Sequence, residues 1–355
     1  GVLLLGVALA GLSQIYTSGN LSEEFQESDP LYQDLKYYES KMGGVVPLEL
    51  VIDTRRPGGA YKSSTLKRLD ALQEDLAEEP KLSRSLSIAD GLKFAKQGFY
   101  RGDPEFYALP TSQERSFIFS YLPEDEEAGN SSLLSSLVDS TGRYARVSMQ
   151  VHDLGKNESE ELKALIYSSL EEHFPDERYD TEVTGSWMVF QKGTTYLIRN
   201  LFVSLGLAIL VIALVMAILF RSISMVAVSL IPNLFPLLLT AGIMGYFGVP
   251  LKPSTILVFS VAFGISVDDT IHFLAKYRQE LKTTGYNIGQ SVLRAVRETG
   301  VSMFYTSIVL FFGFGVFTAS SFGGIVALGI LVSVTLVLAM LANLLLLPSL
   351  LLSFE

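Results

Sequence analysis

Two adjacent aspartates lie inside a long apolar stretch of this sequence. Asp268 and Asp269 fall in the segment Pro253–Ala275, whose centre is near Gly264. At 1.5 Å per helical residue, Asp268 is expected roughly 6 Å from mid-span. An ionised aspartate at that depth costs about 2.5–3.5 kcal/mol, and a second negative charge beside it adds to the cost. Because leucine would be cheaper at either position, the pair predicts a chemical role, namely binding and releasing protons.

Two further residues share a helix face with Asp268. Gly264, Asp268 and His272 are spaced i, i+4, i+8 and therefore lie on one side of the helix. Glycine at that face would let a second helix approach closely. His272 lies within about one turn of both carboxylates and could exchange a proton with either of them. A polar residue near the inner end of a spanning helix would occupy the same position without that role, and both interpretations are open.

Hydroxyl groups on the next apolar stretch form a second candidate set. Thr306 and Ser307 lie at comparable depth and could pair with a buried carboxyl. Hydroxyls also bond back to their own helix, so this assignment stays open as well. No lysine or arginine lies deep in any apolar stretch; Arg199 comes nearest, two residues into its helix at the opposite end. The aspartates are therefore expected to be neutral part of the time, which suits a protonation switch.

The apolar stretches predict a polytopic α-helical membrane domain over residues 197–355. Each is long enough to span a bilayer, which needs about 20 apolar residues. The five expected helices are 197–220, 225–247, 253–275, 301–319 and 325–352. Residues 1–16 contain a shorter apolar run, which we interpret as part of a further transmembrane helix, so the sequence is expected to be a fragment.

Basic residues between the third and fourth stretches predict the orientation. The expected loop 276–300 carries five basic residues against Glu280 and Glu298; the basic ones are Lys276, Arg278, Lys282, Arg294 and Arg297. By the positive-inside rule this loop is cytoplasmic, which places residues 17–196 outside and the C-terminus inside. Within it, residues 284–299 have the pattern of a short amphipathic helix at the inner face.

The polar block at 17–196 predicts a water-exposed α+β domain. It holds 32 of the 37 acidic and 19 of the 27 basic residues of the chain. Alternating or apolar patterns predict strands, and helical periodicity predicts two helices around them. The expected strands are 45–53, 82–88, 116–122, 143–153 and 179–184, and the expected helices are 63–79 and 158–173. A strand–helix–strand unit on each side of the insert 89–141 is what a ferredoxin-like split fold needs.

Several function classes find no support in the sequence. There is no cysteine, and His152, His173 and His272 lie too far apart in the chain to predict a metal site. Neither a phosphate-binding loop nor a Gly-x-Ser-x-Gly elbow is present. We therefore expect no metal, no cofactor, no nucleic-acid partner and no enzyme activity. The absence of disulfides also favours a bacterial origin for so large an exported domain.

The residues around the aspartates resemble those of a known transporter superfamily. The run from Phe263 to Leu274, followed by Tyr277-Arg278 and later by Thr306–Leu310, resembles the resistance-nodulation-division (RND) superfamily. It is most similar to the MMPL-like predicted exporters, which are related to Patched and to the sterol-sensing-domain proteins. The segment Ile231–Pro236 looks like the proline-bearing helix that precedes the acidic one in that family.

The resemblance implies a fold, a partner and roles for the candidate residues. It implies one six-helix half, here the C-terminal one with its first helix truncated, and a porter-like extracytoplasmic domain. Asp268 and Asp269 would be the proton-relay carboxylates, with His272, Thr306 and Ser307 beside them and with Gly264 and Asn233 packing helices at the relay. A second half, either covalently linked on the same chain or on a homologous chain, would complete the transporter. A homo-oligomer and a periplasmic partner are also possible. The drug-efflux branch adds an intramembrane lysine that this sequence lacks, which favours the lipid-exporting branch.

The sequence is compatible with three functions. The first is export or transfer of lipids or other hydrophobic molecules, driven by the proton-motive force, across or out of the cytoplasmic membrane. In that case the protein is expected in the bacterial inner membrane, in contact with membrane lipids, with its large domain on the periplasmic side. The second is sterol or lipid sensing without pumping. The third is help with Sec-type protein export, which the large block at 17–196 disfavours.

Overall fold

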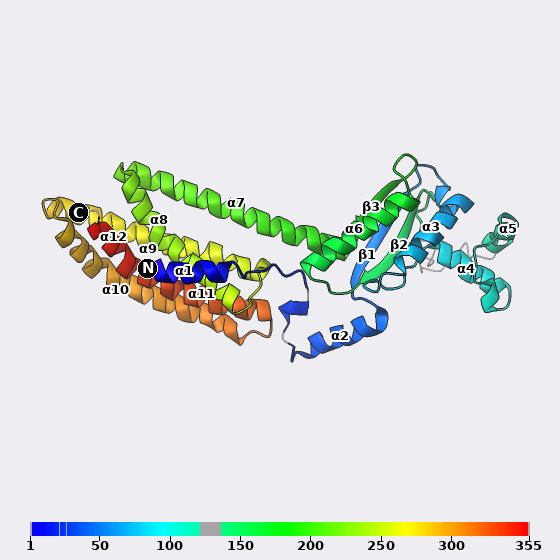
Figure 1. The fold of residues 1–355 in the computed structure, drawn as a ribbon, viewed down its shortest axis with the longest axis horizontal. Coiled ribbons are helices and arrows are strands. Elements are labelled where there is room, and N and C mark those ends of the chain that lie inside the picture. The colour runs from blue at the N-terminus through cyan, green and yellow to red at the C-terminus, as the bar shows by residue number, and fades with distance from the viewer. Residues whose placement is uncertain (1, 21, 26, 121–135, 354–355) are drawn as a thin grey trace. The chain divides into compact units, whose positions relative to one another are not determined.

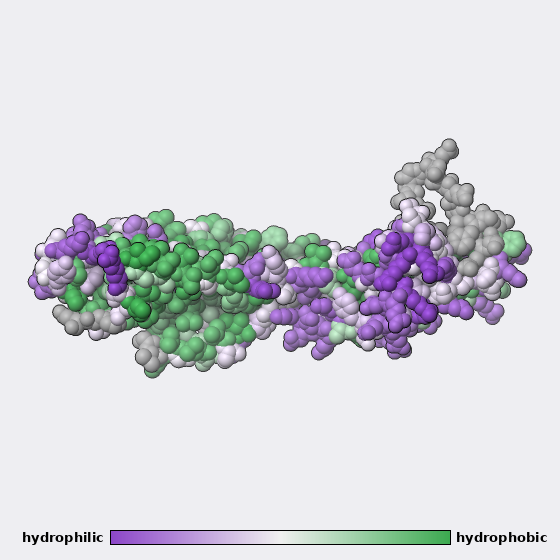
Figure 2. All heavy atoms as spheres, turned by 90° about the horizontal axis from the view of Figure 1, so that it is seen from above, coloured by the Kyte–Doolittle hydropathy of each residue, from purple (hydrophilic) through white to green (hydrophobic). Residues whose placement is uncertain are grey.

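The computed structural model describes residues 2–20, 22–25, 27–120 and 136–353 (Figure 1). The chain divides into two compact units. Unit 1 consists of Gly1–Ser18, Glu23–Asp29 and Thr194–Glu355, and unit 2 consists of Gly19–Ser22 and Pro30–Gly193. Hydrophobic residues cover most of the visible surface of the unit 1 helices, with hydrophilic residues gathered at their left end, and hydrophilic residues cover most of unit 2 (Figure 2).

Five described helical segments are long and apolar enough to cross a membrane. They are α7 (Ser186–Phe220), α8 (Ile223–Tyr246), α9 (Pro253–Thr283), α10 (Ile288–Gly315) with its 3₁₀ extension Val316–Ala319, and the segment formed by α11 (Gly323–Leu341), a π-helical turn (Ala342–Leu346) and α12 (Leu347–Ser353). The shorter apolar helix α1 (Val2–Leu12) packs along α8. The protein is therefore a multi-pass membrane protein.

The segment 276–300, expected to be a loop with a short helix at 284–299, is helical except at residues 284–287. Helix α9 continues past Ala275 to Thr283, and α10 begins at Ile288. Two local features explain the difference. Lys276 and Glu280 form an i, i+4 ion pair that supports the last turns of α9. Asn287 caps α10 by accepting a hydrogen bond from the Gln290 amide.

Glycines set the close contact between α1 and α8. A Cβ atom added at Gly245 would lie 1.8 Å from the carbonyl oxygen of Gly11, and one at Gly242 would lie 2.7 Å from Cα of Ala8. The hydroxyl of Tyr246 donates to the carbonyl of Val7 at 2.9 Å. Small residues at facing positions bring two helix backbones together, which is how transmembrane helices associate without a hydrophobic driving force.

Helix α9 has several neighbours within unit 1. It packs against α8, α10 and α11, and its buried side chains include Phe263, Phe273 and Leu274. Helices α7 and α10, in contrast, expose most of their apolar side chains. Such surfaces are stable against lipid or another protein, not against water.

Unit 2 contains an antiparallel sheet in the order β2-β1-β3. Its strands are β1 (Val46–Asp53), β2 (Tyr144–Val151) and β3 (Asp180–Thr184). The helices α3 (Ser63–Leu76) and α6 (Lys156–His173) contribute Leu69, Ile166 and similar side chains to the same core as the strands. The remaining helices are α2 (Pro30–Met42), α4 (Ile88–Phe99) and α5 (Ser112–Ser120), with 3₁₀ turns at Gly59–Tyr61 and Pro104–Phe106. A further 3₁₀ turn spans Ser22–Glu24.

Two expected strands differ from the observed structure. Residues 82–88 make only the isolated bridges Leu82–Val151 and Leu86–Ser148, and Ser87 then caps α4 in a capping box with Asp90. Residues 112–120 form helix α5, so the described part of the expected strand 116–122 is wrong; residues 121–122 lie outside the described residues. Thr111 and Glu114 cap this helix reciprocally, a local signal that outweighs the β-prone side chains following it.

Candidate functional site in helix α9

The two aspartates lie midway along α9, and Asp268 is on its exposed face. The side chains of Asp268 and His272 are 73% and 74% exposed, and Oδ1 of Asp268 lies 3.5 Å from Nε2 of His272. Asp269, one residue on, is half-buried. The structure thus places His272 beside Asp268, one turn away along the same face.

Gly264 lies on the same face, one helical turn before Asp268, and no described residue packs against it. It is exposed, and a Cβ atom added there would have no atom within 4 Å. The close helix approach that glycine permits at this position is therefore not made by any described residue of this chain. We define the α9 open face as Gly264, Asp268 and His272.

The opposite side of α9 carries a buried polar network. The hydroxyl of Ser266 donates to Oδ1 of Asn233 at 2.6 Å, and the hydroxyl of Thr270 lies 3.0 Å from the same oxygen. Thr270 also lies 2.8 Å from Oδ1 of Asn343, whose amide donates to the carbonyl of Ser266 at 3.2 Å. All four residues are at most 2% exposed. Because buried polar groups need partners, this network locks α9 to α8 and to the π-helical turn.

The two faces of α9 therefore differ in their chemistry. At 100° per residue, Ser266 and Thr270 lie about 160° around the helix from Asp268. Neutral amides and hydroxyls satisfy one another on the buried side, whereas the ionisable groups lie on the open side. Ser266, Thr270 and Asn343 were not among the residues singled out from the sequence. Their signal was the i, i+4 spacing of two hydroxyls and the presence of an asparagine in an apolar segment.

Thr306 and Ser307 on α10 are not joined to the aspartates by a hydrogen bond. The Thr306 hydroxyl is exposed and bonds to the carbonyls of Ser302 and Met303 in its own helix, at 3.1 and 3.0 Å. Ser307 is 5% exposed and lies on the buried side of α10. Helix α10 itself packs along α9. The structure thus brings the two helices together without joining these hydroxyls to the carboxylates.

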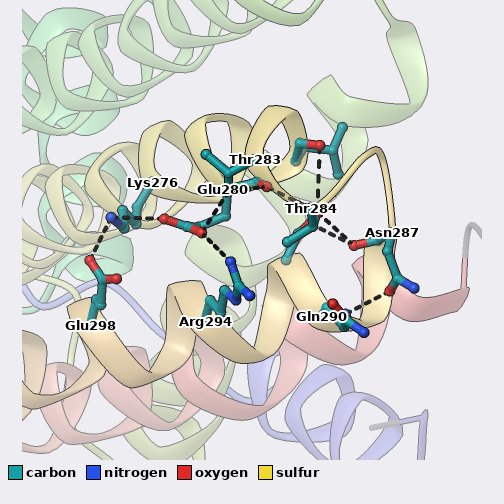
Figure 3. Close-up of polar contacts among 10 residues, drawn as sticks. Lys276, Glu280, Thr283, Thr284, Asn287, Gln290, Arg294 and Glu298 are labelled. Carbon is teal, nitrogen blue, oxygen red and sulfur yellow. Dashed lines mark hydrogen bonds and ion pairs between the residues drawn. The ribbon is translucent and has the colours of Figure 1, made fainter.

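Ion pairs fix the C-terminal end of α9 (Figure 3). Glu280 accepts from Lys276 at 3.0 Å and from Arg294 of α10 at 3.5 Å, and Lys276 also contacts Glu298 at 2.5 Å. The Thr283 hydroxyl donates to Glu280 at 3.0 Å. These contacts tie the last turns of α9 to the first turns of α10.

The first turn of α9 is held by the segment that follows α1. Nζ of Lys252 lies 3.5 Å from Oε1 of Glu24, and the Ser254 hydroxyl lies 3.3 Å from the same oxygen. The amide of Leu251 donates to the carbonyl of Tyr16 at 2.8 Å. Both ends of α9 are thus anchored within unit 1, while the open face between them has no packing partner among the described residues.

This arrangement can bind and pass protons. Two carboxyl groups and one imidazole follow one another within one turn of an anchored helix, and no lysine or arginine of the described chain pairs with Asp268 or Asp269. Across the described ranges, no group of three or more histidines or carboxylates could hold a metal ion.

Comparison with known proteins gives two matches. The family model described as "MMPL family" matches residues 53–354. A protein of Methanocaldococcus jannaschii, whose name describes it only as a membrane protein, is 30% identical over 103 residues, which are 29% of this chain and 26% of that protein. The chain thus spans about a quarter of the length of the curated relative it matches.

Proposed function

The chain belongs to the MMPL family, and on that basis we propose that it is a membrane transporter that exports lipids or similar hydrophobic molecules using the proton-motive force. The export would run across or out of the cytoplasmic membrane. The family accounts for the substrate class, and the residues of α9 account for the proposed driving force.

The observation that carries this proposal is the position of the Asp268 carboxylate. It lies in the middle of a membrane-length helix, largely exposed, with His272 as its neighbour. An ionised carboxylate facing lipid there costs about 2.5–3.5 kcal/mol, so such residues are kept where they carry ions or protons. A carboxyl group that takes up and releases protons is neutral for part of the time, so it does not carry the energetic cost of a buried charge permanently.

The proposed relay assigns a role to each candidate residue. Asp268 and Asp269 bind the proton, and His272 exchanges it with Asp268 at the 3.5 Å separation observed. Thr306 and Ser307 supply hydroxyls from α10 once the helices shift. Asn233 holds the buried side of α9 in place, so that a change of charge on the open face acts on a fixed helix.

We propose that the α9 open face docks against a second MMPL half, either on the same native chain or on another copy. Gly264 supports this, because a Cβ atom added there would meet no described atom within 4 Å and glycine permits close helix contact. Docking would also remove Asp268 from lipid. The relay would then lie at the interface between the halves.

We further propose that unit 2 is a ferredoxin-like porter domain on the periplasmic side of the bacterial inner membrane. The bridges of Leu82 and Leu86 to β2 support the fold, because they add the segment 82–86 to the sheet beside β2, opposite β1. The basic residues at the α9–α10 end of unit 1 support the orientation, since such residues favour the cytoplasm.

The proposal is tested in proteoliposomes with an imposed pH gradient. The probe is phosphatidylethanolamine carrying a fluorescent nitrobenzoxadiazole headgroup, whose movement is followed by quenching. We expect gradient-dependent probe movement that is abolished when Asp268→Asn and Asp269→Asn are combined, and kept in the control Glu298→Gln. Gradient-dependent movement that survives the double substitution would rule out the relay. Saturable probe binding without any movement would favour lipid sensing instead.

A further inference from the structure

A cavity of about 480 Å³ in unit 2 has a cationic rim. Four basic side chains line it: Arg55 and Arg56 after β1, Lys62 before α3, and Arg178 before β3. Glu177 is the one carboxylate among the lining residues. This local positive charge contrasts with the block 17–196, in which acidic residues outnumber basic ones by 32 to 19.

None of the four cations has an ion-pair partner among the described residues, whereas several other basic residues of unit 2 do. Arg143 pairs with Asp53, Arg146 with Glu49, and Lys96 with Glu114. The cavity cations, in contrast, make no such pair within the described part of the chain. Like charges repel, so four cations gathered around one cavity without partners favour an anion between them.

The N-terminal end of α3 contributes Lys62, Ser64 and Thr65 to the lining of the cavity. Lys62 is the N-cap of α3, and its side chain does not cap the helix. The amides of Ser63, Ser64 and Thr65 therefore begin the helix without an intrahelical acceptor. Thr65 lines the cavity and is 2% exposed as a residue, yet its hydroxyl is not among the buried atoms that lack a partner. The hydroxyl is therefore reachable from the cavity and could donate a hydrogen bond to a ligand there.

We propose that this cavity binds a phosphate group. Guanidinium groups bind phosphate oxygens in a bidentate manner, and the amides at a helix N-terminus bind the same oxygens. The cavity offers more hydrogen-bond donors than the two oxygens of a carboxylate can accept. A phosphate group has more acceptor oxygens and carries up to two negative charges. The phosphate comes either from a lipid headgroup or from a free phosphate. The site lies entirely within unit 2 and does not depend on the proton relay.

The full chain in dodecyl maltoside, a phosphate-free detergent, is titrated calorimetrically at constant ionic strength. One arm uses inorganic phosphate and the other uses glycerophosphoglycerol, the water-soluble headgroup of phosphatidylglycerol. The test variants are Arg56→Gln combined with Arg178→Gln, and Thr65→Val. The matched control is Lys67→Gln, which removes one exposed charge from α3 outside the cavity. The fluorescence of Trp187, the single tryptophan and a core residue of unit 2, confirms that each variant is folded.

We expect saturable binding that weakens at least about tenfold in the double arginine variant, the change expected for losing charged hydrogen bonds. Lys67→Gln should bind as the native chain does. Tighter binding of glycerophosphoglycerol would assign the site to a lipid headgroup, and tighter binding of inorganic phosphate would assign it to free phosphate. The absence of saturable binding in both arms, or an equal loss in Lys67→Gln, would overturn the proposal. If Thr65→Val does not fold, the substitutions at the exposed arginines still decide it.

Discussion

The carboxylate of Asp268 and the imidazole of His272 lie 3.5 Å apart on a face of α9 that nothing in the described chain covers. Both side chains are about three-quarters exposed, although the helix is apolar and long enough to cross a bilayer. An exposed pair of ionisable side chains would be ordinary on the surface of a water-soluble protein. In a membrane helix it implies a protein neighbour, a proton, or both.

The α9 open face is predicted to lie at an interface between halves. The chain contains no cysteine, so Gly264→Cys introduces a single thiol. Where two copies dock through this face, we expect Gly264→Cys to form a disulfide-linked dimer under mild oxidation, visible on a non-reducing gel. The control is Leu210→Cys on α7, which is 64% exposed but lies on a different helix. Equal cross-linking at both positions would indicate random collisions and contradict docking through α9.

The buried network is predicted to stabilise unit 1. Asn233→Ala removes the acceptor shared by Ser266 and Thr270. The Ser266 hydroxyl then loses its partner, whereas Thr270 keeps Asn343 and the carbonyl of Ser266. Hydrogen bonds between membrane helices contribute about 0.6–1.7 kcal/mol each, so we expect a loss of roughly 1–3 kcal/mol. Thermal unfolding of the detergent-solubilised chain measures it. Ser349→Ala, which removes only a hydrogen bond to the carbonyl of Leu345 in its own helix, should change little. Equal effects would show that the network adds no stability.

The α1–α8 contact is predicted to tolerate no side chain at Gly245. A Cβ atom there would overlap the carbonyl of Gly11, so Gly245→Ala must push α1 away from α8. Overpacking of this kind typically costs about 1–3 kcal/mol. Gly206→Ala on α7 is the matched control, because a Cβ atom there meets nothing within 4 Å; it should be neutral or stabilise the helix by up to about 1 kcal/mol. The same thermal assay compares them, and an unchanged Gly245→Ala would contradict the observed packing.

Much of this architecture follows from local patterns. The expected strands 45–53 and 143–153 lie within two residues of β1 and β2, because alternating apolar residues such as Leu48, Leu50 and Ile52 cover one buried face. The five membrane-spanning segments follow from length and hydropathy in the same way. Helix α5 was missed because the cap of Thr111 and Glu114, rather than its aromatic residues, decides the local structure.

The site was only partly predictable for a related reason. The i, i+4 spacing of Asp268 and His272 follows from helix geometry alone, so their contact could be expected. The pairing of Thr270 with Asn343 could not, because it joins residues far apart in sequence through a π-helical turn. Likewise, only the tertiary structure shows that a Cβ atom at Gly264 would meet no described atom within 4 Å.

Unit 2 is predicted to lose stability in acid through Asp53. The hydrogen-bonded Arg143 guanidinium, at 2.6 Å from each carboxylate oxygen, holds the pKa of Asp53 below its usual range. The unfolded chain therefore binds a proton more readily than the folded one. Stability from this pair is complete above the unfolded pKa, near 3.9, and is lost as the pH falls through the folded pKa. Asp53→Asn should lower the unfolding temperature at pH 7 by a few degrees and flatten its dependence on pH below about 4.

The fluorescence of Trp187 measures this prediction, because it reports on the core of unit 2. Asp103→Asn is a suitable control: Asp103 lies at the start of a 3₁₀ turn and accepts only from the backbone amide of Glu105. The same acid dependence in Asp53→Asn and in the native chain would contradict the assigned role of the Asp53–Arg143 pair.

The central claim, that Asp268 and Asp269 carry protons for transport, is tested most directly by proton movement itself. Proteoliposomes containing the pH-sensitive dye pyranine are placed in an acidic buffer, and the fluorescent phosphatidylethanolamine probe is added. We predict that the probe accelerates proton entry through the native chain, and that Asp268→Asn combined with Asp269→Asn abolishes this acceleration in correctly folded protein. Probe-dependent proton entry at the native rate in the double variant would contradict the account.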